Sequence, residues 1–290
     1  MKPHTFRYKY TDILNQTIEQ MVNLALDEDI NRQSGGVDIT AQLVPQEKFV
    51  QAKLRANEAG IMCGKKWFES CFKIIDSDIL IEWNCDDEQS FVKGQILCTI
   101  SGNARAILTA ERSAMNFLQT LSGTATQTAS YVKMLSDQSC RLLDTRKTLP
   151  GFRLAQKYAV VCGGGYNHRI GLFDAYLIKE NHIRACGNIA LAVKKARELH
   201  PEAPIEVEVE NLDELEQALA CGVEVIMLDN FSNSMKCKAV DINNGRSALE
   251  ASGDITLDSI SSVAKTGVDY ISVGAITKNV QAIDLSLLIQ

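Results

Sequence analysis

The chain has 290 residues, about twice the usual size of one domain, so one large barrel or two smaller units are the leading options. Hydrophobic residues make up 46% of it and charged residues 23%, a composition that excludes a disordered, collagen-like or coiled-coil protein. The formal net charge of −6 argues against a general nucleic-acid binder. No apolar run reaches the roughly 20 residues that cross a bilayer, so no membrane association is expected.

The cysteines and the start of the chain indicate a cellular compartment. Nine cysteines occur at irregular spacing without a Cys-x-x-Cys pair, so neither a zinc site nor a redox pair is indicated. The start of the chain has no apolar segment followed by a small-residue cleavage site, which a secretory signal would have. We therefore expect a cytoplasmic protein in which most cysteines are reduced core residues.

The first hundred-odd residues mix helix and strand patterns. Apolar residues at helical spacing predict a helix over 11–29. Strand-like runs follow it, at residues 49–56, 61–63, 79–83 and 96–100. A second helix is expected from about Asn103 to Gly123. This part therefore forms a small α+β unit, with the second helix leading out of it.

The remainder alternates helices with short buried strands. Apolar runs rich in Val, Ile or Leu end near Asp144, Ile178, Val209, Asp229, Ala251 and Gly274. Residues 211–229 and 256–274 repeat one helix–strand unit without gaps, and each helix closes on a glycine, Gly222 or Gly267. Such repeats build a parallel barrel or an open doubly wound sheet. Polar groups at the strand ends along the whole array favour the barrel.

Positive charge is concentrated in the middle of the chain. Residues 141–184 carry eight Lys or Arg against three Asp or Glu, although the whole chain is negative. The positive charges of such a segment repel one another unless an anionic ligand binds to it. We therefore favour a small anionic ligand with carboxylates or phosphates over a solvated helix face.

Acidic side chains end the strands that follow. Glu206, Glu208 and Glu210 share one face of a strand, because successive side chains alternate between faces. At least one of Glu206 and Glu210 is expected to be solvated at the strand end. Asp229 directly ends the next apolar run. Glu208 and Asp229 are therefore expected to hold Mg²⁺ or ribose hydroxyls and to stabilise an oxocarbenium-like transition state.

A glycine run, Gly163-Gly164-Gly165, precedes His168 and Arg169. A dinucleotide-binding loop would need Gly-x-Gly-x-x-Gly opening a helix after an N-terminal strand, and that setting is absent here. We favour a turn that delivers His168 and Arg169 to the site.

Taken together, these motifs resemble those of the quinolinate phosphoribosyltransferase family. The matching segments run in the family's order from about Asp38 to the C-terminus, at 111–119, 144–148, 163–169, 179–183, 206–208, 228–230, 252–253 and 272–275. The resemblance implies that quinolinate and phosphoribosyl pyrophosphate give nicotinate mononucleotide, CO2 and pyrophosphate, with Mg²⁺, in de novo NAD synthesis. It implies attack of the quinolinate ring nitrogen on C1′, followed by loss of the 2-carboxylate.

The resemblance also implies a fold. An N-terminal α/β sandwich domain would precede an incomplete, seven-stranded TIM-like α/β barrel. We place the sandwich at residues 1–115, joined by residues 281–290, and the barrel catalytic domain at 116–280.

Roles for individual residues follow from the resemblance as well. The quinolinate pocket would be lined by Arg146, His168, Arg169 and Lys179. Catalytic contacts to phosphoribosyl pyrophosphate and its Mg²⁺, direct or through water, would come from Lys147, Glu208 and Asp229. Further substrate contacts would come from Thr145, Ser252, Gly253, Asp254, Val273, Gly274 and Ala275, with Ser252, Gly253 and Gly274 holding the 5′-phosphate. Arg112 would enter the neighbouring subunit's site, which implies an obligate homodimer.

Two positions depart from the family pattern. Asp254 stands where an uncharged residue is common, and we expect its side chain to point outward while its N–H is offered to the phosphate. Tyr166 stands where relatives often have a basic residue.

Two rival functions remain open: a protein of the same architecture linked to molybdenum transport, with another acceptor, and a non-catalytic sensor of small anions. The inward acids speak against the sensor.

Overall fold

The computed structural model describes residues 11–135 and 139–290, which form two compact units. The sandwich unit comprises residues 11–129 with Leu154–Gly164 and Asn279–Gln290. The barrel unit comprises Ser130–Arg153 and Gly165–Lys278. The domain limits set at residues 115 and 280 remain predictions.

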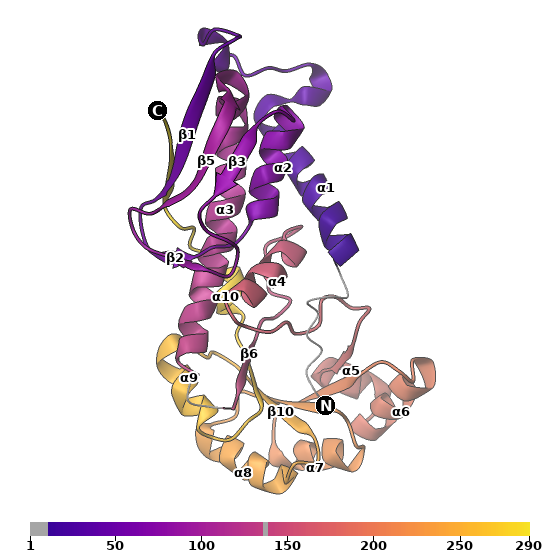
Figure 1. The fold of residues 1–290 in the computed structure, drawn as a ribbon. Helices are drawn as coiled ribbons and strands as arrows, with labels where there is room; N and C mark the ends of the chain where they lie inside the picture. The colour runs from indigo at the N-terminus through magenta and orange to yellow at the C-terminus, as the bar shows by residue number, and fades with distance from the viewer. Residues whose placement is uncertain (1–10, 136–138) are drawn as a thin grey trace. The chain divides into compact units, whose positions relative to one another are not determined.

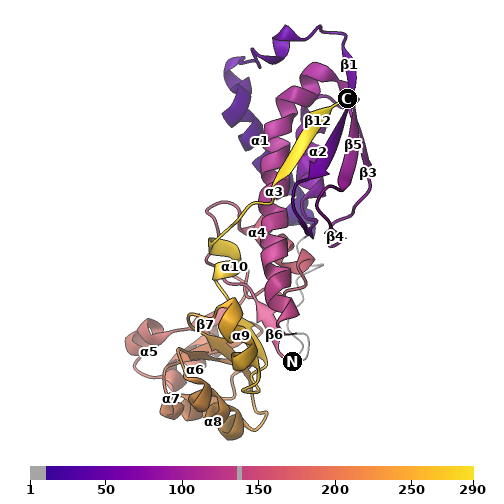
Figure 2. The ribbon, with the colours of Figure 1, turned by 90° about the vertical axis from the view of Figure 1, so that its left-hand side faces the viewer.

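A four-stranded antiparallel sheet, in the order β12-β1-β5-β3, organises the sandwich unit. Its strands are β1 (Phe49–Ala56), β3 (Leu80–Trp83), β5 (Ile96–Asn103) and β12 (Leu285–Ile289). The C-terminal strand β12, yellow in Figure 2, completes the sheet by pairing with β1. The short strands β2 (Gly60–Ile61) and β4 (Ser90–Phe91) form a separate pair.

Helices cover one side of this sheet (Figure 1). They are α1 (Thr11–Ile30), α2 (Lys65–Ile75) and α3 (Ala104–Lys133), with α4 (Arg153–Cys162) and two short 3-10 helices, η1 (Arg32–Ser34) and η2 (Ala41–Leu43). Trp67, Phe68 and Phe72 of α2 are completely buried. Their burial supplies much of the hydrophobic contact between helices and sheet.

A parallel sheet in the order β6-β11-β10-β9-β8-β7 organises the barrel unit. The strands are β6 (Arg141–Leu143), β7 (Tyr176–Ile178), β8 (Ile205–Val209), β9 (Val225–Asp229), β10 (Ala248–Ser252) and β11 (Tyr270–Ser272). A parallel bridge from Leu143 to Tyr166 adds a seventh strand position beside β6. The unit is therefore an incomplete α/β barrel, as predicted.

Helices lie between successive strands of the barrel unit. They are α5 (Glu180–Cys186), α6 (Ile189–Leu199), α7 (Leu212–Ala220), α8 (Asn233–Asn243), α9 (Leu257–Ala264) and α10 (Ala275–Lys278). Asn211 caps α7 by accepting from the N–H of Glu214 at 2.9 Å. Gly222 and Gly267 follow α7 and α9 with φ of 62° and 91°, a conformation that favours glycine. The predicted repeat of residues 211–229 and 256–274 is confirmed.

Strand register places the charged side chains on one face of the barrel sheet. Glu208 pairs with Met227, and Met227 pairs with Glu250. Because paired residues of a parallel sheet point to the same side, Glu208 and Glu250 share a face. Asp229 lies two residues beyond Met227 and therefore points the same way. This face forms the interior of the barrel.

The sandwich unit shows where sequence patterns were incomplete. The predicted helix over 11–29 and the strand over 49–56 are confirmed. Helix α2 was not predicted, and α3 continues ten residues beyond Gly123, where we expected it to end. Among the described residues, no helix is long and apolar enough to cross a membrane.

Candidate active site

The predicted site residues, apart from Arg112, all belong to the barrel unit and lie at or just beyond the carboxyl ends of its strands. In α/β barrels this end carries the active site, because the loops that leave the strands converge there. Arg112 lies on the part of α3 that belongs to the sandwich unit, and it is exposed.

Asp144 holds the segment that contains Asn167 and His168 by hydrogen bonds. It directly follows β6, is completely buried, and accepts hydrogen bonds from Asn167 Nδ2 at 2.7 Å and from the His168 N–H at 2.8 Å. A buried carboxylate is stable only when such donors satisfy it. Asp144 therefore fixes the segment that carries His168 and Arg169. Sequence reasoning named Asp144 only as a strand end.

Arg146 and Arg169 each lie three residues beyond a pair of bridged positions, Leu143 and Tyr166, so the two arginines leave neighbouring strand positions. The positive charge of Arg146 lowers the pKa of Arg169, although burial of Arg169 is the larger cause. The Nε atom of Arg146 is buried without a hydrogen-bond partner among the described residues. Two neighbouring guanidinium groups with a buried donor favour an anionic ligand that accepts from both.

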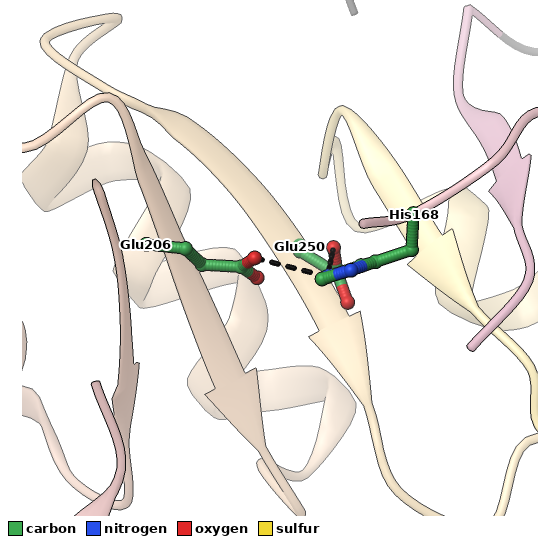
Figure 3. A group of neighbouring side chains, drawn as sticks. All are labelled: His168, Glu206 and Glu250. Atoms are coloured by element: carbon green, nitrogen blue, oxygen red, sulfur yellow. Dashed lines mark ion pairs between the residues drawn. The ribbon is translucent and has the colours of Figure 1, made fainter. Parts of the chain in front are cut away.

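His168, Glu206 and Glu250 meet inside the barrel (Figure 3). His168 Nε2 lies 2.9 Å from Glu206 Oε2 and 3.5 Å from Glu250 Oε2. Glu206 is 8% exposed and Glu250 is 1% exposed. Of the two glutamates for which solvation was considered, Glu210 is exposed and Glu206 is not. Glu250 was not predicted. Its neighbours Leu249 and Ala251 are buried on one face of the strand, so by the period-two rule Glu250 points to the opposite face, inside the barrel.

Lys179 and Glu208 form an ion pair across the ends of β7 and β8. Lys179 directly follows β7, and its side chain is 45% exposed, whereas that of Glu208 is 14% exposed. The pair places one cation and one carboxylate at the same point of the barrel end.

Asp229 ends β9 and accepts a hydrogen bond from Asn230 Nδ2 at 2.9 Å. Gly253 lies against the same asparagine, since a Cβ at Gly253 would come within 2.1 Å of Asn230 Oδ1. Gly253 also has a φ of 104°, which side-chain-bearing residues rarely adopt. Ser252 pairs with Asp229 in the sheet register, so this carboxylate and the loop after β10 are neighbours.

The loop after β6 contacts the loop after β11. Thr145 Oγ1 accepts from the Lys147 N–H at 3.1 Å, and Thr277 Oγ1 donates to the Lys147 carbonyl at 2.8 Å. A Cβ at Gly274 would come within 2.9 Å of Lys147 Cδ, so the lysine side chain packs over this glycine. Val273 is buried, and Gly274 and Ala275 are half-buried.

The two departures from the family pattern have local explanations. Asp254 is exposed and has a φ of 39°, the left-handed region that Asp and Asn tolerate better than most residues. The ring of Tyr166 lies 4.9 Å from the guanidinium carbon of Arg141, a cation–π contact.

The chain is similar to known proteins over almost its whole length. Residues 38–122 match the model of the quinolinate phosphoribosyl transferase N-terminal domain, and residues 124–288 match that of its C-terminal domain. The probable carboxylating nicotinate-nucleotide pyrophosphorylase of Bacillus subtilis is 39% identical over 271 residues, which cover 93% of this chain and 92% of the relative. The carboxylating enzyme of Mycobacterium leprae is 38% identical, with 92% and 95% covered.

A solved structure shows the same architecture. The nicotinate-nucleotide pyrophosphorylase of Francisella tularensis superimposes with a TM-score of 0.92 at 52% identity, covering 95% of this chain and 97% of that one. Both units of the present chain therefore have counterparts in this relative.

Proposed function

Since this chain belongs to the quinolinate phosphoribosyltransferase family, we propose that its barrel-end site joins quinolinate to phosphoribosyl pyrophosphate and releases CO2. The products are nicotinate mononucleotide, CO2 and pyrophosphate, and the reaction is the step of de novo NAD synthesis that forms the pyridine nucleotide. The observation that carries this assignment to particular residues is the position of Arg146 and Arg169, which leave neighbouring strand positions of the barrel and interact electrostatically.

Quinolinate fits the cationic part of the site. Its two adjacent carboxylates offer four acceptor oxygens, and a guanidinium group binds a carboxylate through two parallel hydrogen bonds. Arg146 contributes a buried Nε donor, while Arg169 lies beside it. Lys179 adds a positive charge at the end of β7, and His168 would form part of the pocket wall. Two guanidinium forks match a pyridine dicarboxylate better than a monocarboxylate.

Phosphoribosyl pyrophosphate fits the remaining strand ends. Lys147 would contact its pyrophosphate, with Thr145 holding the Lys147 backbone in place. The 5′-phosphate would bind at the small residues after β10 and β11, where backbone N–H groups can approach it. These residues are Ser252, Gly253, Asp254, Val273, Gly274 and Ala275. The outward side chain of Asp254 leaves its N–H available without placing a carboxylate on the phosphate.

The residues present fit a Mg²⁺ ion. Glu208 and Asp229 point from neighbouring strands to the same face of the sheet, and carboxylate oxygens are the ligands that Mg²⁺ prefers. Because Lys179 already pairs with Glu208, contact through water is favoured over direct coordination. Bound there, the ion would neutralise charge on the departing pyrophosphate.

The chemistry needs no nucleophilic side chain. The electron pair of the quinolinate ring nitrogen forms the N–C1′ bond as the C1′–O bond to pyrophosphate breaks. Glu208 and Asp229 stabilise the positive charge that develops on the ribose ring. The quaternised ring nitrogen then stabilises the electron pair that stays on C2 when CO2 departs, and this pair takes up a proton from solvent to form the C2–H bond. The chain's residues supply orientation and electrostatics.

Two further features belong to this proposal. The exposed side chain of Arg112 would complete a neighbouring subunit's site, making the protein an obligate homodimer. Mixing inactive Arg112→Ala and Arg146→Ala variants tests this, since hybrid dimers would regain activity at one site.

We also place the protein in the cytoplasm, because its nine cysteines are free thiols, as a reducing compartment requires.

The proposal is tested by turnover of purified protein with phosphoribosyl pyrophosphate, Mg²⁺ and either quinolinate or nicotinate. Quinolinate should be converted to nicotinate mononucleotide, and nicotinate should be a poor acceptor because it leaves one guanidinium group without a carboxylate. Equal or faster turnover of nicotinate would contradict the assignment of the arginine pair.

A further inference from the structure

The cluster of His168, Glu206 and Glu250 has a definite arrangement of protons. The backbone N–H of Arg169 donates to His168 Nδ1 at 2.8 Å. An imidazole nitrogen that accepts a hydrogen bond carries no proton, so the ring proton lies on Nε2. This Nε2–H faces Glu206 Oε2 at 2.9 Å and donates to it. His168 is therefore a neutral imidazole with both ring nitrogens engaged by the protein.

Glu250 keeps a proton next to this pair. Burial, the largest cause, and the neighbouring negative charge of Glu206 together raise the pKa of Glu250 to about 8, against a hydrogen bond with Ser272 that lowers it. A positively charged His168 would lower this pKa as well, whereas a neutral ring does not. Below this pH, Glu250 is protonated and carries no charge. Tyr270 and Cys140 also face Glu250, and burial raises the pKa of each, so neither adds charge near neutral pH.

The cluster connects the interior of the barrel to the backbone of a substrate-binding residue. Glu206 comes from β8 and Glu250 from β10, whereas His168 comes from the segment held by Asp144 (Figure 3). The side chain of Arg169, next in the chain, donates from Nη1 to the Ala175 carbonyl at 3.4 Å. The backbone of Arg169 is thus fixed through His168, while its guanidinium group is held at the Ala175 carbonyl and interacts electrostatically with Arg146.

We propose that Glu206 and Glu250 are positioning residues, which hold His168 as the neutral Nε2–H tautomer so that Nδ1 fixes the Arg169 backbone and aims its guanidinium group at a dicarboxylate. This inference rests on the proposed function for the identity of the dicarboxylate. On this account His168 acts on the substrate through Arg169, and loss of Glu206 weakens quinolinate binding without a matching effect on phosphoribosyl pyrophosphate.

A metal site is the alternative for the same three side chains, whose ligand atoms lie within 4.8 Å of one another. A metal ion on Nε2 would displace the proton from that nitrogen, and a neutral ring would then carry it on Nδ1. Nδ1–H would face the N–H of Arg169 at 2.8 Å, so two donors would oppose each other. The observed hydrogen bond therefore favours a proton over a metal ion.

The first test is the tautomer of His168, which does not depend on activity. The chain has four histidines, so long-range ¹H–¹⁵N correlation spectra resolve their ring nitrogens, and His168→Asn identifies the signal that disappears. The expected pattern is the neutral Nε2–H tautomer at pH 7, unchanged by added Zn²⁺ or Mg²⁺. An imidazolium, an Nδ1–H tautomer or a metal-induced shift of this signal would overturn the proposal.

The second test separates hydrogen bonding from packing at position 206. Glu206→Leu fills the space without an acceptor and should raise KM for quinolinate about 10-fold, the effect expected for loss of one charge-assisted hydrogen bond. Glu206→Gln keeps an acceptor oxygen and should restore most of this loss. KM for phosphoribosyl pyrophosphate should stay within about twofold in both. Glu210→Gln changes an exposed glutamate directly after the same strand; it is the matched control and should behave as wild type.

The pH profile gives a readout that a purely structural role would not move. KM for quinolinate should rise above pH 8 in the wild type, as Glu250 ionises, and this rise should be absent in Glu250→Gln. Wild-type protein that does not turn over quinolinate would refute the proposed function. Active wild type with unchanged KM for quinolinate in Glu206→Leu, or with the same pH profile in Glu250→Gln, would refute the positioning role alone. Should Glu206→Leu fail to fold, the tautomer and the Glu250→Gln profile still decide.

Discussion

Lys179 and Glu208 are joined in an ion pair at the ends of two neighbouring barrel strands, so the residue assigned to quinolinate and the residue assigned to the sugar phosphate hold each other in place. On the proposed function, the pair marks the point where the two substrates meet. It also orients the Glu208 carboxylate before either substrate binds.

Removing the negative charge of Glu208 should affect the chemical step. We expect Glu208→Gln to lower kcat about 100-fold, the usual effect of losing one group that stabilises developing charge. Unfolding temperature should change little, because Lys179 is nearly half exposed and such a pair contributes little to stability. Steady-state kinetics and thermal unfolding check this, and a variant that loses activity only through raised KM would contradict a role in the chemical step.

The fork geometry of Arg169 should matter beyond its charge. Arg169→Lys keeps the positive charge but loses the paired donors, so kcat/KM for quinolinate should fall about 100-fold or more. Arg184→Lys is the matched control, since Arg184 belongs to the same basic segment but is exposed and paired with Glu180 on α5. Comparable losses in both variants would indicate that only net charge is required.

Gly253 should be required for the phosphate end of the site. Gly253→Ala places a Cβ against Asn230, the residue that donates to Asp229, and forces a positive φ on a side-chain-bearing residue. We expect KM for phosphoribosyl pyrophosphate to rise about 10-fold, with a stability loss of about 1 kcal/mol from the backbone conformation. Gly222 also has a positive φ, but a Cβ at this position would meet no neighbouring atom. Gly222→Ala should therefore lose stability without the change in KM.

The buried Glu250 should make stability depend on pH. Its pKa rises from an ordinary value of 4.5 to about 8, so between these limits the folded state binds its proton more tightly than the unfolded state does. The free energy of unfolding should therefore fall as pH rises from about 5 to about 8. Glu250→Gln removes this titration, and each pKa unit corresponds to about 1.4 kcal/mol.

Denaturant unfolding at pH 5 and pH 8 checks this sign. The variant should gain stability relative to the wild type as pH rises. A constant difference between the two proteins across this range would show that Glu250 ionises normally in the folded state.

Local patterns predicted the barrel and its strand ends because each repeat is a short-range unit. The caps and glycines of residues 211–229 and 256–274 determine their own helix ends, whatever surrounds them. Helix α2 was missed because it lies among strand-like runs, and Gly64 with a φ of 114° begins it without a side-chain cap. Gly123 lies inside α3 and does not end it. The backbone of Gln281 packs so close that a Cβ at Gly123 would meet its carbonyl oxygen at 2.0 Å, so this glycine serves packing.

The buried part of the site was the hardest to predict. Glu206 and Glu250 come from different strands and are separated by 44 positions in the numbering, so only the sheet register brings them together at His168. Lys179 and Asp229 end apolar runs directly and could be identified by position, and Glu208 could be identified by its alternation with Val207 and Val209. Long-range pairing of buried charges has no comparable local signature.

The central claim is that one barrel end binds both substrates and couples decarboxylation to phosphoribosyl transfer. It is tested most directly with quinolinate carrying ¹³C in its 2-carboxylate. Labelled CO2 should appear in step with nicotinate mononucleotide, only when phosphoribosyl pyrophosphate is present, and at least about 100-fold more slowly with Arg169→Lys. Labelled CO2 released without phosphoribosyl pyrophosphate, or nucleotide that retains the label, would contradict the account.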